Sequence, residues 1–510
     1  MALVGAAVHA QVAGLPGLGD GDSLSLSAER QLGDRIAREL YRDPAYIEDP
    51  VLDEYIQLLW APLIRAAAAR GELSPELQER FAWRILLGRD RSVNAFALPG
   101  GYLGVHLGLI AVVGSHDELA SVLAHELSHV SQRHIARGMG EQSRLAPWLI
   151  GAMVLGVLAA SKNPEGAQAL IVGGQAAAAQ SQLSYSRDME READRVGYGI
   201  LVDAGYDPRG FVGMFGKLQQ AAGLNDSGAF PYLRSHPLTV ERMADMQSRQ
   251  QLLSSASAPP PSMAQAMMSA RARVLSQSQA DALKAWTQDA EQPAAQESSA
   301  QRAGKLYAGT LAYLQQRDMA AAQRTLQQLQ RFVASAAMAT EASAPWPAAD
   351  MAAQRWVDLL AVELALQQER FETALDLLWP GARAQRMPRP ELIAAAQAAL
   401  QLPQHRALPD LTRQLRERVF LTPHDAQAWH VLGQLLAAQG QTLPALRAQA
   451  EAQVARLDWQ GAIDRFRAAQ DWARQARLQA ADHIEASIVD ARLRYAQDRL
   501  RAQQAPGALP

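Results

Sequence analysis

The spacing of apolar residues in the first half of the chain predicts helices separated by short breaks. Residues 23–69 follow a helical pattern that Pro44 and Pro50 interrupt. A further helix is predicted to begin at Ser115, where Glu118 has the spacing of a capping box, and to end at Gly138. Its apolar positions recur every three or four residues, at Leu119, Val122, Leu123, Leu127 and Val130.

Residues 84–113 have a different character. Branched and aromatic residues lie on both sides of Pro99-Gly100-Gly101, a sequence that breaks regular structure. This pattern predicts a short strand or hairpin, and it is the one convincing β region of the sequence. The chain is therefore expected to be mainly α with a small β-sheet.

The second half of the chain is rich in Ala, Gln, Leu and Arg and is predicted to be helical. Residues 254–300 have the composition of a linker with a helical segment, and residues 301–510 contain spacings typical of a tetratricopeptide repeat. The clearest unit is Trp429, Leu432, Gly433, Gly440, Ala445 and Ala452, with Pro423 closing the unit before it. Stacked pairs of this kind form an α-solenoid with a concave binding surface; a generic helical bundle is the alternative.

Two apolar stretches fall short of a membrane span, which needs roughly 18–20 apolar residues. Residues 146–160 predict either a buried core helix or an exposed hairpin that touches a membrane surface or an unfolded substrate. Residues 1–10 end in small residues, as the tail of a secretory signal peptide does, and we interpret them as a truncated signal. The alternative is a disordered apolar N-terminus on a cytosolic protein.

Charge and composition exclude several classes of function. The 510-residue chain is long enough for two or three domains, and its net charge of −3 gives no basic field for nucleic acid. It contains no cysteine, which excludes disulfides and thiol catalysis. Histidines and carboxylates are then the available ligands for a transition metal.

An HExxH pattern lies inside the helix predicted from Ser115. His125 and His129 are four residues apart and project from one face, so both imidazoles can bind one Zn²⁺ ion, while Glu126 points toward a water on the metal. His134, five residues after His129, is assigned to the helix surface, away from the ligand face.

A second charged helix offers the third ligand. Glu190 and Asp194 are four residues apart, so one carboxylate can bind zinc while the other accepts a hydrogen bond from a ligand histidine. An exposed charged face is the plainer interpretation, and we keep it for Arg191 and Glu192. The expected zinc site therefore consists of His125, His129 and one carboxylate of this pair, with Glu126 as general base.

Four motifs in this order resemble the membrane- and periplasm-associated zinc metallopeptidases that include the CAAX prenyl endopeptidases and the HtpX-type heat-shock proteases. They are His125 to His129, Glu190 to Asp194, Asn94 to Gly101 before them, and Ser235-His236-Pro237 with Arg242 after them. The repeat-like tail narrows the resemblance to the periplasmic branch of beta-barrel assembly-enhancing proteases. This resemblance implies a zincin-type α+β peptidase domain over residues 23–253, followed by the α-solenoid.

With this resemblance, Glu190 is expected to be the third zinc ligand and Asp194 to lie behind the ligands. The resemblance also implies roles for further residues. His236 would stabilise the oxyanion or occupy the open zinc position and hold the enzyme latent, and Arg242 would tie its loop to a cleft carboxylate or support the oxyanion. The strand of Asn94, Ala95, Phe96 and Ala97 would pair with an extended peptide, although an ordinary hairpin fits the sequence as well.

The function implied is that of a zinc-dependent endopeptidase, with one Zn²⁺ per chain. It would act in the periplasm on misfolded or stalled outer-membrane proteins, with or without peripheral membrane contact. Its repeats would recruit clients or the outer-membrane β-barrel assembly machinery. The alternative is a chaperone or scaffold in which proteolysis is rare or latent. A zinc aminopeptidase for small peptides is disfavoured, because a repeat domain suits protein-sized clients.

Overall fold

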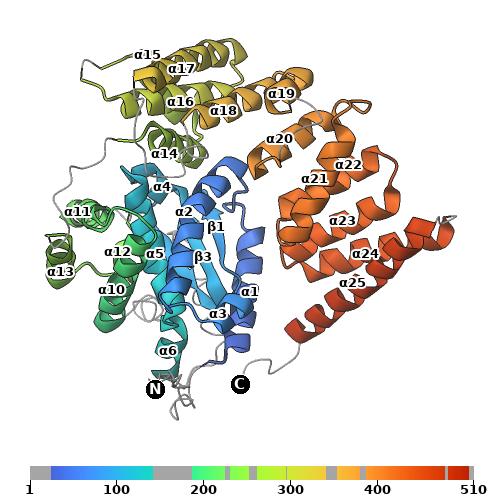
Figure 1. The fold of residues 1–510 in the computed structure, drawn as a ribbon, viewed down its shortest axis with the longest axis horizontal. Helices are drawn as coiled ribbons and strands as arrows, with labels where there is room; N and C mark the ends of the chain where they lie inside the picture. The colour runs from blue at the N-terminus through green and yellow to red at the C-terminus, as the bar shows by residue number, and fades with distance from the viewer. Residues whose placement is uncertain are drawn as a thin grey trace, which may run out of the picture.

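The computed structural model describes most of the chain and shows a mainly helical protein with one small sheet (Figure 1). The described residues are 24–141, 186–223, 230–251, 261–294, 296–339, 353–379, 386–476 and 480–504. The predictions for residues 1–10 and 146–160 lie outside these ranges. Within the described residues, no helix is both long enough and apolar enough to cross a membrane.

The predicted β region forms a sheet of three strands in the order β1-β3-β2. Strand β1 (Arg84–Gly88) runs parallel to β3 (Tyr102–His106), and β2 (Ala95–Leu98) runs antiparallel to it, with Ala97 opposite Leu103. A 3-10 turn, η1 (Pro99–Gly101), connects β2 to β3. Gly100 has φ 71°, and a Cβ there would lie 2.7 Å from the Cα of Arg30, so only glycine lets α1 (Leu26–Arg42) pack this closely.

Helix α5 (His116–Ser131) carries the HExxH pattern, and most of its residues are buried in the hydrophobic core of the first half of the chain. Ser115 caps it by accepting a hydrogen bond from the N–H of Glu118 at 3.2 Å, as predicted. Glu118 does not complete the capping box, because its carboxylate binds the N–H of Gly114 and the amine of Lys217. The elements around α5 include α2 (Pro50–Ala69), α3 (Pro75–Arg80), α4 (Leu107–Val112), α10 (Arg187–Asp203), α11 (Arg209–Gly223), α12 (Tyr232–Ser235) and α13 (Val240–Gln251).

The prediction that this helix continues to Gly138 is wrong. Helix α5 ends at Ser131, and α6 (His134–Glu141) begins three residues later. Arg133, between them, has φ 54°, a left-handed conformation that interrupts the α-helix. Its side chain bonds Glu29 of α1 at 3.1 Å, and this contact holds the turn.

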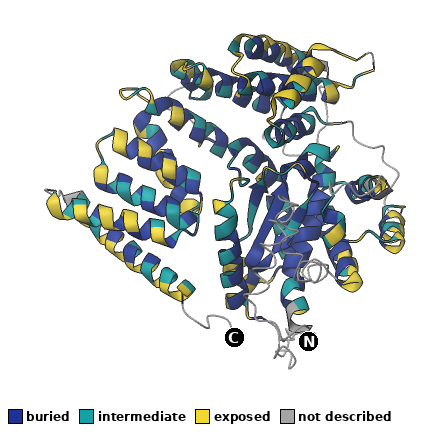
Figure 2. Ribbon diagram, turned by 180° about the vertical axis from the view of Figure 1, so that it is seen from behind, coloured by how far each residue is buried: buried dark blue, intermediate teal, exposed yellow. Residues whose placement is uncertain are grey.

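Helices after residue 262 curve around the first half of the molecule (Figure 1). Figure 2 shows buried residues gathered in the sheet and the helices around it, with exposed residues along the outer faces of the C-terminal helices. These helices are α14 (Met263–Ser276), α15 (Ala280–Glu291), α16 (Ser299–Gln315), α17 (Met319–Ala339), α18 (Ala353–Gln367), α19 (Phe371–Leu378), α20 (Arg389–Leu400), α21 (Leu408–Leu421), α22 (Ala426–Ala438), α23 (Thr442–Ala455), α24 (Trp459–Gln475) and α25 (Ala480–Gln504).

Helix α14 lies within the segment expected to be a linker, yet it packs into the core of the first half. The hydroxyl of Ser269 donates to the carbonyl of Ile110 in α4 at 2.8 Å. Arg271 donates to both carboxylate oxygens of Asp49, just before α2, at 2.9 Å to Oδ1 and 2.7 Å to Oδ2. Because both side chains are buried, α14 is part of the structure that packs against α2 and α4.

The clearest repeat-like unit corresponds to the neighbouring helices α22 and α23. Trp429 and Gly433 lie on α22, Ala445 lies on α23, and Gly440 with φ 74° makes the turn between them. The indole of Trp429 donates to the carbonyl of Pro423 at 2.8 Å, which connects the unit to the preceding loop. This geometry agrees with a helical hairpin, and the solenoid assignment itself stays a prediction.

Candidate metal centre

Close packing of α10 on α5 brings the two predicted ligand helices together. Gly197 is the residue of α10 that makes this approach, since a Cβ there would lie 3.0 Å from the carbonyl oxygen of Ala124 and 3.1 Å from the backbone nitrogen of His125. Any larger side chain would push the helices apart and move Glu190 away from the histidines.

Four buried side chains converge at this contact. One ligand atom from each of His125, His129, Glu190 and His236 lies within 4.8 Å of the others. The Nε2 atoms of His125 and His129 are 3.0 Å apart, and Nδ1 of His236 lies 3.3 Å from Nε2 of His125 and 2.9 Å from Oε1 of Glu190. Within the ranges that the structure describes, no other group of three or more His, Asp or Glu residues converges in this way.

Glu126 lies beside these ligands and is fully buried. Among the described residues, neither of its carboxylate oxygens accepts a hydrogen bond, and Oε1 lies 3.4 Å from Nε2 of His236. A buried carboxylate without a donor is costly to the folded state. Glu126 therefore makes no hydrogen bond within the described residues that would offset the cost of its burial.

Asp194 and Arg242 support the ligands from behind. Oδ1 of Asp194 lies 3.0 Å from Nδ1 of His125, the ring nitrogen that faces away from the cluster. Arg242 binds Asp194 with two hydrogen bonds of 2.6 and 2.8 Å and also lies 2.6 Å from Oε2 of Glu190. The guanidinium of Arg242 thus fixes the orientation of the carboxylates of both Asp194 and Glu190.

His236 comes from the short loop after α12. The ring of Tyr232 stacks on its imidazole with centroids 4.5 Å apart, and the carbonyl of Pro237 accepts a hydrogen bond from Arg242 at 2.8 Å. The loop is therefore fixed both by a stacked ring and by the arginine that binds α10. Tyr232 was not predicted as a site residue, and a lone tyrosine before a loop gives no signal of this role.

Burial and charge act in opposite directions on the pKa values of this cluster. Burial opposes a charge on His125, but hydrogen bonds to Asp194 and Glu190 outweigh it and raise the pKa of His125 to about 9. Burial lowers the pKa of His129 well below its usual value. Burial also opposes ionisation of Glu190 and Asp194, yet the neighbouring histidines lower the pKa of Glu190, and Arg242 and His125 lower the pKa of Asp194. Both carboxyls are accordingly ionised at neutral pH.

The assignment of His134 to the helix surface is wrong. Its side chain is buried, and its Nδ1 lies 2.8 Å from Nδ1 of His129. Its Nε2 lies 3.0 Å from Oε2 of Glu192, which also accepts a hydrogen bond from Arg137 at 2.8 Å. The turn at Arg133 causes this difference, because positions five apart on a continuous helix point in different directions.

The strand predicted to bind substrate is β2, at one edge of the sheet. Asn94 precedes it, and Ala95, Phe96 and Ala97 belong to it. The strand pairs with β3 on one side, and the carbonyl of Asn94 accepts a hydrogen bond from the N–H of His106 at 3.0 Å. Its position at an edge agrees with pairing to an extended peptide.

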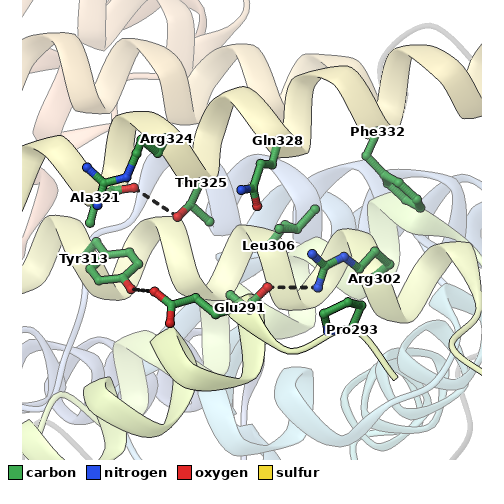
Figure 3. A pocket seen from close by; sticks show the side chains of 11 residues that line it. Glu291, Pro293, Arg302, Leu306, Tyr313, Ala321, Arg324, Thr325, Gln328 and Phe332 are labelled. Atoms are coloured by element: carbon green, nitrogen blue, oxygen red, sulfur yellow. Dashed lines mark hydrogen bonds between the residues drawn. The ribbon is translucent and has the colours of Figure 1, made fainter. Parts of the chain in front are cut away.

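A cavity of about 420 Å³ lies far along the chain from these residues, between α15, α16 and α17 (Figure 3). Its lining includes Arg302, whose guanidinium donates to the carbonyl of Ala290 at 2.9 Å, and Tyr313, whose hydroxyl bonds Glu291. None of the converging ligands lines it. This cavity is therefore separate from the converging side chains of α5 and α10.

Comparison with known proteins agrees with this location. Residues 62–250 match the family model described as peptidase family M48. A relative from Vibrio cholerae serotype O1, assigned as a beta-barrel assembly-enhancing protease, is 38% identical over 237 residues, which cover 46% of this chain and 47% of the relative. The beta-barrel assembly-enhancing protease of Escherichia coli K12 is 34% identical over the same shares.

A more distant relative is the mitochondrial metalloendopeptidase OMA1 of Arabidopsis thaliana, 32% identical over 38% of this chain and 36% of its own length. The matching part spans about half the length of the bacterial relatives. The converging ligands at 125, 129, 190 and 236 all fall inside the matched region. Residues 62–250 of this chain are a peptidase family M48 domain.

Proposed function

We propose that this chain is a zinc-dependent endopeptidase. The observation that carries the proposal is the buried group of His125, His129, Glu190 and His236 with the carboxylate of Glu126 beside it. Two or three imidazoles and a carboxylate form the nitrogen and oxygen set that zinc prefers. Asp194 lies against the outer ring nitrogen of His125, where a polar partner that orients a metal ligand is expected.

His125, His129 and Glu190 would hold the ion. A bound Zn²⁺ supplies a water of lowered pKa and polarises a peptide carbonyl. Glu126 would accept the proton of that water and return it to the leaving amine, and its lack of a hydrogen-bond donor supports this role. Asp194 and Arg242 would keep the ligands oriented, with Arg242 also tying the His236 loop to α10.

His236 has two proposed roles, and its geometry supports the latent state. Its Nδ1 lies among the ligand atoms, so it would occupy the fourth position and exclude substrate there. When the loop moves, the same imidazole would be placed to stabilise the oxyanion. The edge strand of Asn94, Ala95, Phe96 and Ala97 would hold the peptide main chain in either case.

We propose misfolded or stalled outer-membrane proteins as substrates and the periplasm as the location; the bacterial relatives, named as proteases that enhance β-barrel assembly, support this proposal. The proposed division is a truncated signal at residues 1–10, the peptidase at 23–253, a connecting segment at 254–300 and repeats at 301–510. The repeats would recruit clients or the β-barrel assembly machinery. The rival function is a chaperone or scaffold with rare proteolysis, which the extent of the helical half supports.

The test is hydrolysis of unfolded casein by zinc-loaded wild type, His236→Ala and Glu126→Gln, with zinc content measured on the same samples. We expect His236→Ala to cut faster than wild type and Glu126→Gln to be inactive with zinc bound. If none of the zinc-loaded samples hydrolysed casein, the result would favour the chaperone or scaffold function. Full activity of Glu126→Gln would refute the assignment of the general base.

A further inference from the structure

Each of the two histidines of the HExxH pattern has its own polar partner on the ring nitrogen that faces away from the cluster. For His125 the partner is Asp194, at 3.0 Å. For His129 the partner is the imidazole of His134, at 2.8 Å between the two Nδ1 atoms. A histidine is an unusual partner here. It has to accept a hydrogen bond through one ring nitrogen and donate its own proton to another acceptor through the other nitrogen.

The contacts of His134 meet that requirement. When Nε2 of His129 faces the ligand cluster, its single proton is on Nδ1 and donates to Nδ1 of His134. His134 then carries its proton on Nε2, which donates to Oε2 of Glu192 at 3.0 Å. Arg137 donates to the same oxygen at 2.8 Å, so every donor in the series has an acceptor.

The local structure holds His134 in this position. It is the first residue of α6, and the left-handed turn at Arg133 directs its ring back toward α5. Arg133 is itself bonded to Glu29. The imidazole of His134 is 1% exposed and packs edge-on against His129 with centroids 4.8 Å apart. Burial excludes the alternative that water takes over the hydrogen bond to His129.

We propose that His134 is a positioning residue for the metal site, and that its hydrogen bond, backed by Glu192, fixes the tautomer and ring orientation of His129. The inference rests on the zinc site proposed above. His134 does not bind the ion, since it is absent from the group of converging ligand atoms. Partners of this kind commonly change metal affinity by about 10–100-fold when they are removed.

The test compares the zinc dissociation constants of the full-length wild type and three variants by competition with a chelator. His134→Leu removes the acceptor at similar volume, and His134→Asn keeps an acceptor oxygen near the place of Nδ1. His116→Leu is the matched control, because it makes the same change at the opposite end of α5. Thermal unfolding of chelator-treated samples shows whether each variant is folded.

We expect His134→Leu to weaken zinc binding by about 10–100-fold, His134→Asn to recover most of the affinity, and His116→Leu to bind as the wild type does. Folded His134→Leu with unchanged affinity would overturn the proposal, as would His134→Asn that is folded and as weak as His134→Leu. A wild type that binds no zinc would refute the metal site itself, which is a different outcome.

Nitrogen spectra of zinc-loaded protein with labelled histidines give a second measurement if His134→Leu does not fold. We expect a coupling across the hydrogen bond between Nδ1 of His129 and Nδ1 of His134, and its loss in His134→Asn. A spectrum in which His129 carries no proton on Nδ1 would contradict the proposal.

Discussion

Two regions of the molecule bury charged side chains, and they do so in different ways. Between α2 and the C-terminal helices, Arg389 lies 2.9 Å from Asp425 and 3.3 Å from Asp53, and Arg418 lies 2.7 Å from Asp425. We call these four residues the ionic cluster. Each of its charges has an opposite charge beside it, so the region serves to join two parts of the fold.

At the candidate metal centre only some of the buried charges are paired in this way, where Arg242 binds Asp194 and Glu190. Three histidines and Glu190 bring their ligand atoms together, and Glu126 is buried without a hydrogen-bond donor. An arrangement of this kind costs stability unless a cation completes it. The difference is that every charge of the ionic cluster is paired, whereas the candidate metal centre also contains a buried carboxylate without a hydrogen-bond donor.

Glu126→Gln should produce the largest difference between the two regions. We expect hydrolysis to fall by about 10²–10⁴-fold with zinc retained, because only the proton acceptor is lost. Stability should be unchanged or higher, since a buried carboxylate without a donor disappears. Asp425→Asn in the ionic cluster should leave the rate per folded molecule unchanged. Casein hydrolysis, with zinc content determined on the same samples, measures the rates of both variants.

Arg242→Met should cause the largest loss of stability. Asp194 and Glu190 would remain buried without the cation that binds both, at a cost of about 3–5 kcal/mol. Arg389→Met should cost less, because Arg418 still pairs with Asp425. Urea unfolding of both variants at equal zinc loading measures the two losses of stability. Equal losses would contradict the distinction between the two regions.

Asp425→Asn should lower the free energy of unfolding at pH 7 by about 1–3 kcal/mol. Burial opposes ionisation of Asp425, but the charges and hydrogen bonds of Arg389 and Arg418 outweigh it and lower its pKa well below the usual value. A lowered pKa in the folded state gives stability above about pH 4 that is lost as the pH falls further. The difference between variant and wild type should therefore shrink toward pH 3; a constant difference would contradict this.

Arg191→Ala should have the smallest effect. Its ion pair with Asp188 measures 2.6 Å, but the side chains are 63% and 87% exposed, so solvent screens the charges. We expect a change within about 0.5 kcal/mol and no change in zinc binding. A large loss of zinc in this variant would mean that the whole charged face of α10 belongs to the site.

The sequence predicts the parts of the site that depend on spacing within one helix. His125 and His129 on α5, and Glu190 and Asp194 on α10, have the four-residue spacing that places side chains on one face. The small sheet around Pro99-Gly100-Gly101 is confirmed for the same reason, because its pattern is local.

What the sequence does not show depends on contacts between distant residues or on unusual backbone conformations. Arg133 gives no signal of its positive φ, so His134 is placed on the wrong face. Arg499 of α25 bonds Asp34 of α1 at 3.0 Å, and no local pattern connects residues so far apart along the chain. Likewise, the composition of residues 254–300 indicates a linker, although Arg271 of α14 is buried against Asp49.

Crystals of the zinc-loaded chain, measured with X-rays just above and below the zinc absorption edge, would test the central claim most directly. The account predicts one anomalous peak per chain, between Nε2 of His125, Nε2 of His129 and the carboxylate of Glu190. A peak elsewhere in the molecule, or none at this place, would contradict it.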